Sequence, residues 1–191
     1  LFFIQKKDII FTKQVIILLI IIGIIGNFIP FFLISWAEQF IPSSTAGMLM
    51  AIGPIITLIM SHFLTKNEKF SLMKIISITI GLVGVFFIFN INSFNNLFSS
   101  TSIEIYAKLL VILAAFGYMF SNIIAYEKLS NIDSFSITTF ATTFGAIFSL
   151  PFFVYDMGVN NFEYDFDYKS VYAIFYLGIF PTAIAFQFRY Y

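Results

Sequence analysis

Hydrophobic residues form six long runs along the chain, and polar residues gather in the connections between them. The runs cover residues 14–36, 46–64, 72–89, 105–126, 135–155 and 171–188. A helix crosses the roughly 30 Å hydrocarbon core of a bilayer in about 20 residues, which matches these lengths. Strands of a membrane β-barrel would be about ten residues long, with polar and apolar positions alternating. The pattern therefore predicts an all-α, polytopic transmembrane helix bundle with six spans.

Basic residues favour one end of these spans. Lys and Arg concentrate in cytoplasmic connections. If the spans alternate in direction, eight basic residues fall on one side and two on the other: Lys6, Lys7, Lys13, Lys66, Lys69, Lys74, Lys128 and Arg189 against Lys108 and Lys169. We therefore expect the first span to run from inside to outside, in a multi-pass protein of the cell (inner) membrane.

The composition agrees with a lipid environment and removes several classes of function. Only 10% of the residues are charged, against about 25% in soluble domains. Acidic and basic residues number ten each, so the net basic face that a nucleic-acid partner needs is not expected. The chain has no cysteine and one histidine, His62, and this composition indicates neither a disulfide framework nor a metal or other cofactor.

The first and sixth spans match one another without a gap. Residues 23–31 align with residues 178–186, so that Gly23 falls on Gly178 and Asn27 on Thr182. The two spans are five helices apart and therefore cross the bilayer in opposite senses. Inverted repeats of this kind, with glycine and proline interrupting corresponding helices, are a transporter architecture.

Several segments together resemble one transporter family. They are FIPSSTAGMLMAIGP at 40–54, LTKNEK at 64–69, GLVGV at 81–85, AAFGY at 114–118 and LGIFPTA at 177–183. This pattern resembles the EamA family of the drug/metabolite transporter superfamily. The chain departs from the family pattern at Lys66-Asn67, which lengthens the approach to Glu68, and at Tyr118, where tryptophan is more usual.

The resemblance implies a ten-helix fold of two inverted repeats, of which this chain would be a fragment with about six full spans. Residues 1–90 would hold the end of the first repeat (the tail of its second helix and the third to fifth helices). Residues 105–191 would hold the start of the second repeat, the sixth to eighth helices. The apolar residues 1–4, followed at once by polar ones, read as the last turn of a preceding span, so we expect further helices on either side.

Polar residues inside a membrane span are candidates for function, because hydrocarbon offers them no partner. The candidate substrate-binding residues are Asn27, Tyr118, Asn122, Thr182 and Gln187. Proline frees a backbone carbonyl and lets a helix bend, so the candidate hinges are Pro30, Pro54 and Pro181. Glu68 matches the family's acidic element, and we expect it to cap or pair at the cytoplasmic start of the next helix.

Two stripes of small and polar residues allow more than one interpretation. Ala114, Tyr118, Ser121, Asn122 and Ala125 share one helical face, which is either a cavity lining or a helix-packing seam. Gly53, Thr57 and Ser61 recur every four residues, a spacing typical of close helix packing. His62, near a helix end, is expected to be hydrogen-bonded rather than to relay protons.

The leading hypothesis is a multi-pass transporter that moves a small metabolite or drug-like solute without ATP hydrolysis. A non-transporting membrane scaffold is the alternative. An intramembrane enzyme is disfavoured, because Asp133 and Asp156 lie outside the apolar runs and His62 lies near a span end. The expected partners are the lipid bilayer and a small-molecule substrate, and the sequence leaves open whether two chains associate as a homodimer.

The topology is testable because the natural chain has no cysteine. A single cysteine at Lys69→Cys should react with a membrane-impermeant thiol reagent only from the cytoplasmic side, and one at Asp165→Cys only from outside. Labelling of intact cells and of inverted vesicles measures both. Reaction of the two positions from the same side would contradict the alternating topology.

Overall fold

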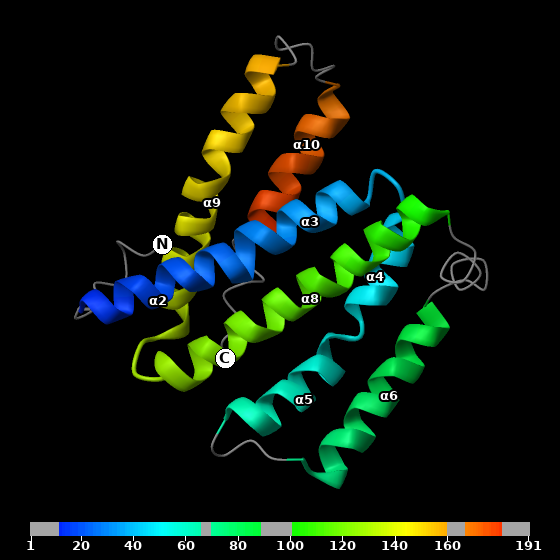
Figure 1. Ribbon diagram of the computed structural model, residues 1–191, viewed down its shortest axis with the longest axis vertical. Coiled ribbons are helices and arrows are strands. Elements are labelled where there is room, and N and C mark those ends of the chain that lie inside the picture. The colour runs from blue at the N-terminus through cyan, green and yellow to red at the C-terminus, as the bar shows by residue number, and fades with distance from the viewer. Residues whose placement is uncertain (1–11, 66–69, 89–100, 160–166, 181–191) are drawn as a thin grey trace.

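Helices account for the regular structure throughout residues 12–65, 70–88, 101–159 and 167–180, which the computed structural model describes. In chain order they are α2 (Lys13–Gly23), the π-helix η1 (Ile24–Phe28), α3 (Ile29–Ala37), α4 (Ser43–Met50), α5 (Gly53–Leu64), α6 (Leu72–Ile88), α8 (Ser102–Lys128), α9 (Ser134–Val159) and α10 (Tyr168–Leu177) (Figure 1). The all-α prediction is confirmed.

Within the described residues, four of the expected spans form helices that are long and apolar enough to cross a membrane. They are Lys13–Ala37, Ser43–Leu64, Ser102–Lys128 and Ser134–Asp156, and Leu72–Val85 forms a shorter apolar helix. The third expected span corresponds to α6, which has 17 residues up to Ile88, where the described segment ends. The second half of the sixth lies outside the described residues.

The first span is continuous but contains a π turn. The N–H of Ile29 donates to the carbonyl of Ile24, five residues back, instead of four. Pro30 follows directly and has no N–H, so it cannot close the usual bond to Gly26. A wide turn next to a proline is a recognised local departure from α geometry, and it marks this part of the span as structurally distinct.

The second span is broken into α4 and α5. Between them the N–H of Ile52 donates to the carbonyl of Leu49, three residues back, which tightens and ends α4. Pro54 then lies in the first turn of α5, where its missing N–H would have had no helical partner. The break between α4 and α5 therefore falls just before Pro54, and its role as a hinge stays a prediction.

Small residues let the first span approach α8 and α9 very closely (Figure 1). A Cβ atom placed on Gly23 would lie 2.7 Å from the carbonyl oxygen of Ala141, and one on Gly117 would lie 2.8 Å from that of Ile25. Ser121 is fully buried against Gly26. Without a hydrophobic force between helices in lipid, such small-residue contacts are what hold helices together.

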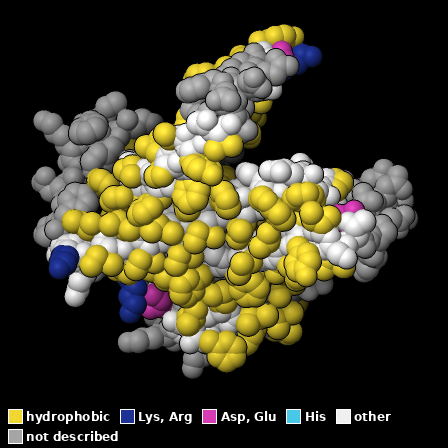
Figure 2. Space-filling view, turned by 45° about the horizontal axis from the view of Figure 1, so that its top comes forward, with side chains coloured by type: hydrophobic (Ala, Val, Ile, Leu, Met, Phe, Trp, Pro, Cys, Tyr) yellow, Lys and Arg dark blue, Asp and Glu magenta, His cyan; other side chains and the backbone are white. Residues whose placement is uncertain are grey.

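The rest of the molecule presents apolar side chains outward. Hydrophobic residues cover most of the face in Figure 2, and charged groups lie at its margins. Leu72 and Phe87 of α6 and Tyr172 of α10 are each more than 70% exposed. Surface of this kind is expected where the solvent is lipid. Lys108, assigned above to the outer end of a span, lies within α8 and is buried.

The close packing predicts that Gly23→Ala destabilises the fold. The added methyl group would overlap the backbone of α9, so we expect a loss of about 1–3 kcal/mol of stability. Gly84→Ala is the matched control, because no atom lies within 4 Å of its Cβ position and alanine favours a helix. Thermal unfolding in detergent micelles, followed by circular dichroism, measures both. Equal midpoints for the two variants would contradict the prediction.

Candidate functional site

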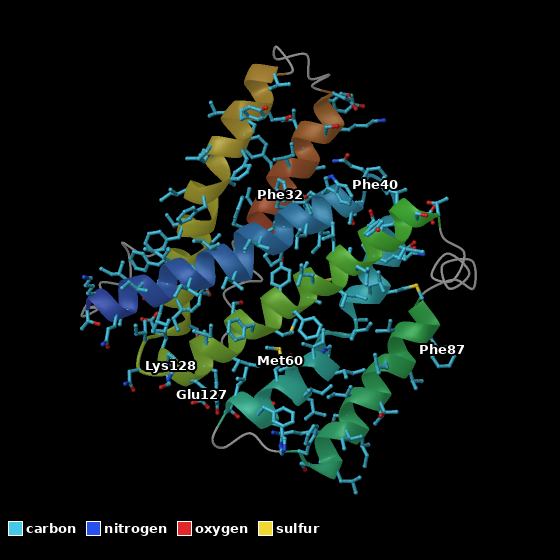
Figure 3. The ribbon with its side chains drawn as sticks, viewed as in Figure 1. Phe32, Phe40, Met60, Phe87, Glu127 and Lys128 are labelled. Atoms are coloured by element: carbon cyan, nitrogen blue, oxygen red, sulfur yellow. The ribbon has the colours of Figure 1, made fainter. Side chains whose placement is uncertain are left out.

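A cavity of about 930 Å³ lies between α5, α6, α8 and the start of α9. Its lining residues are Pro54, Thr57, Leu58, Ser61, Thr65, Met73, Lys74, Ser77, Ile78, Met119, Asn122, Ile123, Ala125, Tyr126, Leu129, Ser130, Ile132, Ser134 and Ile137. The volume lies within the range of small-molecule sites, roughly 300–1,000 Å³. Figure 3 shows Glu127 and Lys128 at the end of α8, beside the connection to α9.

Hydroxyl groups on α5, directly after it and on α6 line this cavity, and each donates its proton to a backbone carbonyl one turn earlier in the chain. Thr57 donates to the carbonyl of Gly53 at 3.0 Å, and Thr65 donates to that of Ser61 at 2.8 Å. Ser77 of α6 donates to the carbonyl of Met73 at 2.9 Å. Each hydroxyl oxygen keeps lone pairs that can accept a hydrogen bond, so these helices offer acceptors to a solute.

The helix break explains how α5 can both pack and line a cavity. Gly53 sits against α8, where a Cβ atom would lie 2.9 Å from Cε of Met119. One and two turns later, Thr57 and Ser61 line the cavity. The stripe interpreted as helix packing is therefore a packing contact at its first residue and a cavity wall at the next two.

Among the described lining residues, Lys74 is the one with a full charge. It lies in the first turn of α6 and is half-buried. The start of α9 is capped by Asp133, which accepts from the N–H of Ser136 at 3.0 Å and from its hydroxyl at 2.9 Å.

Thr57, Ser61 and Lys74 were not among the candidates from sequence. The sequence did contain a signal for these cavity residues: two hydroxyl residues four positions apart, and a lysine just inside the third expected span.

The structure separates the predicted site residues. Asn122 and Pro54 line the cavity. Asn27 is 4% exposed and lies against α9, where a Cβ atom on Gly145 would come within 3.0 Å of its own Cβ. Pro30 is buried beside α8.

Tyr118 also lies away from the cavity lining. Its ring meets that of Phe31 edge to face, with 6.1 Å between centroids. The remaining predicted residues lie outside the described residues: Glu68, Pro181, Thr182 and Gln187. Their roles stay predictions.

The face of α8 that carries small and polar residues therefore serves both roles left open above: one part packs against the first span, and another part lines the cavity. Ala114 and Ser121 are fully buried, and Ser121 lies against Gly26 in the seam with the first span. Asn122, one residue further on, turns toward the cavity. One helix therefore serves both packing and cavity lining, on adjacent strips of its surface.

His62, in the last turn of α5, contacts Phe70 just before α6 and is not among the lining residues of the cavity. Its Nδ1 atom accepts a hydrogen bond from the N–H of Phe70 at 3.3 Å, and its ring lies 4.3 Å from that of Phe70. This agrees with the expectation of a hydrogen-bonded histidine. Within the described residues, no group of three or more His, Asp or Glu side chains is placed to hold a metal ion.

The cavity predicts different thiol reactivity on two faces of α6. A cysteine at Ser77→Cys would lie in the cavity lining, whereas one at Ile76→Cys, the neighbouring position, would lie outside it; both positions are exposed. Thiolate forms in water and not in hydrocarbon, so we expect Ser77→Cys to react with a water-soluble maleimide at least about tenfold faster. Reaction rates in proteoliposomes measure this. Equal rates would mean that the cavity is filled by lipid.

Comparison with known proteins places the chain among membrane transporters. The sequence model of the EamA-like transporter family matches residues 1–90 and 105–191. The chain is 25% identical to the uncharacterized transporter YoaV of Bacillus subtilis, over 96% of this chain and 61% of that protein. It is 27% identical to the uncharacterized transporter YetK of the same organism, over 92% of this chain and 53% of that protein.

An uncharacterized transporter of Buchnera aphidicola is 25% identical, over 93% of this chain and 57% of that protein. The chain thus spans little more than half the length of these relatives. No solved structure matches it significantly. The match to the family model covers nearly all residues, and the helices and apolar surface agree with it, so the chain belongs to the EamA-like transporter family.

Proposed function

We propose that this chain forms part of a transporter that moves a small metabolite or drug-like solute across the cell (inner) membrane without ATP hydrolysis. The observation that carries the proposal is the open-sided cavity of about 930 Å³, with polar and apolar walls, between α5, α6, α8 and the start of α9. Buried hydrogen-bonding groups are rare in membrane spans unless they serve a solute pathway or bind one another. Membership of a transporter family supports the same function.

Alternating access would use the interruptions in the first two spans. The π turn before Pro30 and the break before Pro54 are places where fewer regular backbone bonds resist bending. In transporters built from inverted repeats, interrupted helices lie at the solute site, and one repeat rocks against the other. Residues 1–90 and 105–191 would supply parts of the two repeats, with Pro181 as the counterpart hinge.

The proposed contacts to solute differ in how accessible they are. Asn122 lines the cavity in the conformation described here. Asn27 is buried and Tyr118 packs on Phe31, so these two would reach solute only after the first span separates from α8 and α9. Thr182 would contribute from the sixth span, according to the inverted match between residues 23–31 and 178–186, and Gln187 would contribute as a second polar residue of that span.

Replacing Asn122 tests this assignment. We expect Asn122→Ala to lower solute flux at least about fivefold, because the cavity loses an amide that both donates and accepts hydrogen bonds. Asn131→Ala is the matched control, since Asn131 is exposed and outside the cavity lining. Uptake of a panel of radiolabelled metabolites into proteoliposomes, normalised to protein abundance, measures the effect.

Two outcomes would contradict the proposal in different ways. Unchanged flux in Asn122→Ala would remove this residue from the solute site. The complete absence of protein-dependent flux in the full chain, with the protein correctly inserted, would favour a non-transporting scaffold. Thr182→Ala, examined in parallel, tests the contribution of the sixth span.

A further inference from the structure

We propose that Thr45 keeps the contact between α4 and α8 ready to open: its buried hydroxyl group has no hydrogen bond while the two helices are packed together, and gains hydrogen bonds to water when they part. The corner formed by the end of α3 and by α4 would then act as the outer gate of the transporter. This inference rests on the proposed transport function and names an element that controls access to its pathway.

The hydroxyl group of Thr45 is buried and unpaired. The residue lies in the first turn of α4 and is fully buried. Within the part of the chain that the structure describes, its Oγ1 atom is enclosed and has no hydrogen-bond partner. A hydroxyl group that loses water without gaining another partner costs free energy. Thr45 therefore opposes the packing in which it is found.

The local backbone explains why Thr45 differs from threonines further inside helices. Thr57 and Thr79 each donate to the carbonyl four residues earlier, at 3.0 and 2.9 Å. The residue four positions before Thr45 is Ile41, and Pro42 lies between them with an extended backbone, φ −60° and ψ 144°. Because the chain is not helical before α4, Thr45 lacks the carbonyl that a preceding helical turn would supply.

Small side chains form the contact around this hydroxyl group. Among the described helices, the main neighbour of α4 is α8 (Figure 1). Ala46, next to Thr45, belongs to a buried cluster with Ala37 of α3 and with Ala107 and Val111 of α8. Small side chains let backbones approach closely and reach little past one another. The two surfaces can therefore part and close again without rearranging large side chains.

The backbone is irregular on both sides of α4. Before it, the N–H groups of Gln39 and Phe40 donate to the carbonyls of Trp36 and Ala37, three residues back, which ends α3. After it, the break before Pro54 separates α4 from α5. A helix of eight residues between two such bends can move as a unit. The expected topology places this helix toward the outer side of the membrane.

The contact also joins the two parts of the chain that the proposed mechanism moves. α4 belongs to residues 1–90 and α8 to residues 105–191. Rocking of one part against the other would separate the contact and admit water to Thr45, whose hydroxyl group can both donate and accept. The hydroxyl group is then paired in the open conformation and unpaired in the closed one. A group whose free energy differs between two conformations shifts their populations.

A cysteine in the contact measures how often it opens. Val111 is fully buried there, and the natural chain has no cysteine, so Val111→Cys in the full chain gives a single reporter. Thiolate forms in water, so its rate of reaction with a water-soluble maleimide in proteoliposomes follows the open population. We expect Thr45→Val to slow this reaction about tenfold, because valine fills the same space without a hydroxyl group. Thr45→Ser, which keeps the hydroxyl, should react at least as fast as the parent.

A second measurement distinguishes this role from ordinary packing. Thr45→Val should raise the thermal-unfolding midpoint in detergent, followed by circular dichroism, because the closed contact no longer encloses an unpaired hydroxyl group. Thr142→Val is the matched control, since Thr142 is half-buried and donates to the carbonyl of Thr138 at 2.7 Å. It should leave the reaction rate of Val111→Cys unchanged and should not raise the midpoint. Size-exclusion profiles show whether each variant is folded, and Ala107→Cys replaces the reporter if Val111→Cys is not.

Three results would overturn the inference: a reaction in Thr45→Val as fast as in the parent, an equal slowing in Thr142→Val, or a lower midpoint in folded Thr45→Val. Solute flux in a chain whose opening does not depend on Thr45 would overturn this inference alone. Opening that depends on Thr45, in a chain that moves no solute, would contradict only the proposed transport function.

Discussion

The close approach of the first span to α8 and α9 determines the arrangement of the other described helices. At Gly23 and Gly117 the neighbouring backbone lies where a side chain would otherwise be. In lipid, burying apolar surface gives little free energy for helix association. Helices associate instead through close packing over a large contact area. This seam buries one strip of α8, and the cavity is left on the adjacent strip, between α8, α5 and α6.

The interruptions in the first two spans follow from the same physical constraint. Every backbone N–H and carbonyl group in a membrane needs a partner, and proline removes one donor. The first span accommodates Pro30 with a π turn, whereas the second ends one helix and begins another at Pro54. In the second case Gly53 packs on α8 while Thr57 and Ser61 face the cavity, so the break places packing and solute contact on the same helix.

Asn27 and Asn122 illustrate how far sequence reasoning reached. Both are amides within apolar runs, and the same argument selected both as candidates. Asn122 lines the cavity, whereas Asn27 is buried between the first span and α9. Helical spacing tells which residues share a face but not which neighbour covers that face. Lys74 was overlooked as a cavity residue for the same reason, since its charge had been explained by topology alone.

The sequence by itself determined the class of structure, because the length and apolarity of the runs leave only helices as a way to satisfy the backbone in lipid. It also indicated two places where spans are interrupted, because Pro30 and Pro54 each lack a backbone donor, whereas Pro151 lies inside α9 without breaking it. Only the tertiary structure decided which polar residues share a cavity. That depends on the rotation of each helix against its neighbours, which contacts such as Gly26 with Ser121 and Gly145 with Asn27 settle through close packing. Local periodicity carries no information about those contacts.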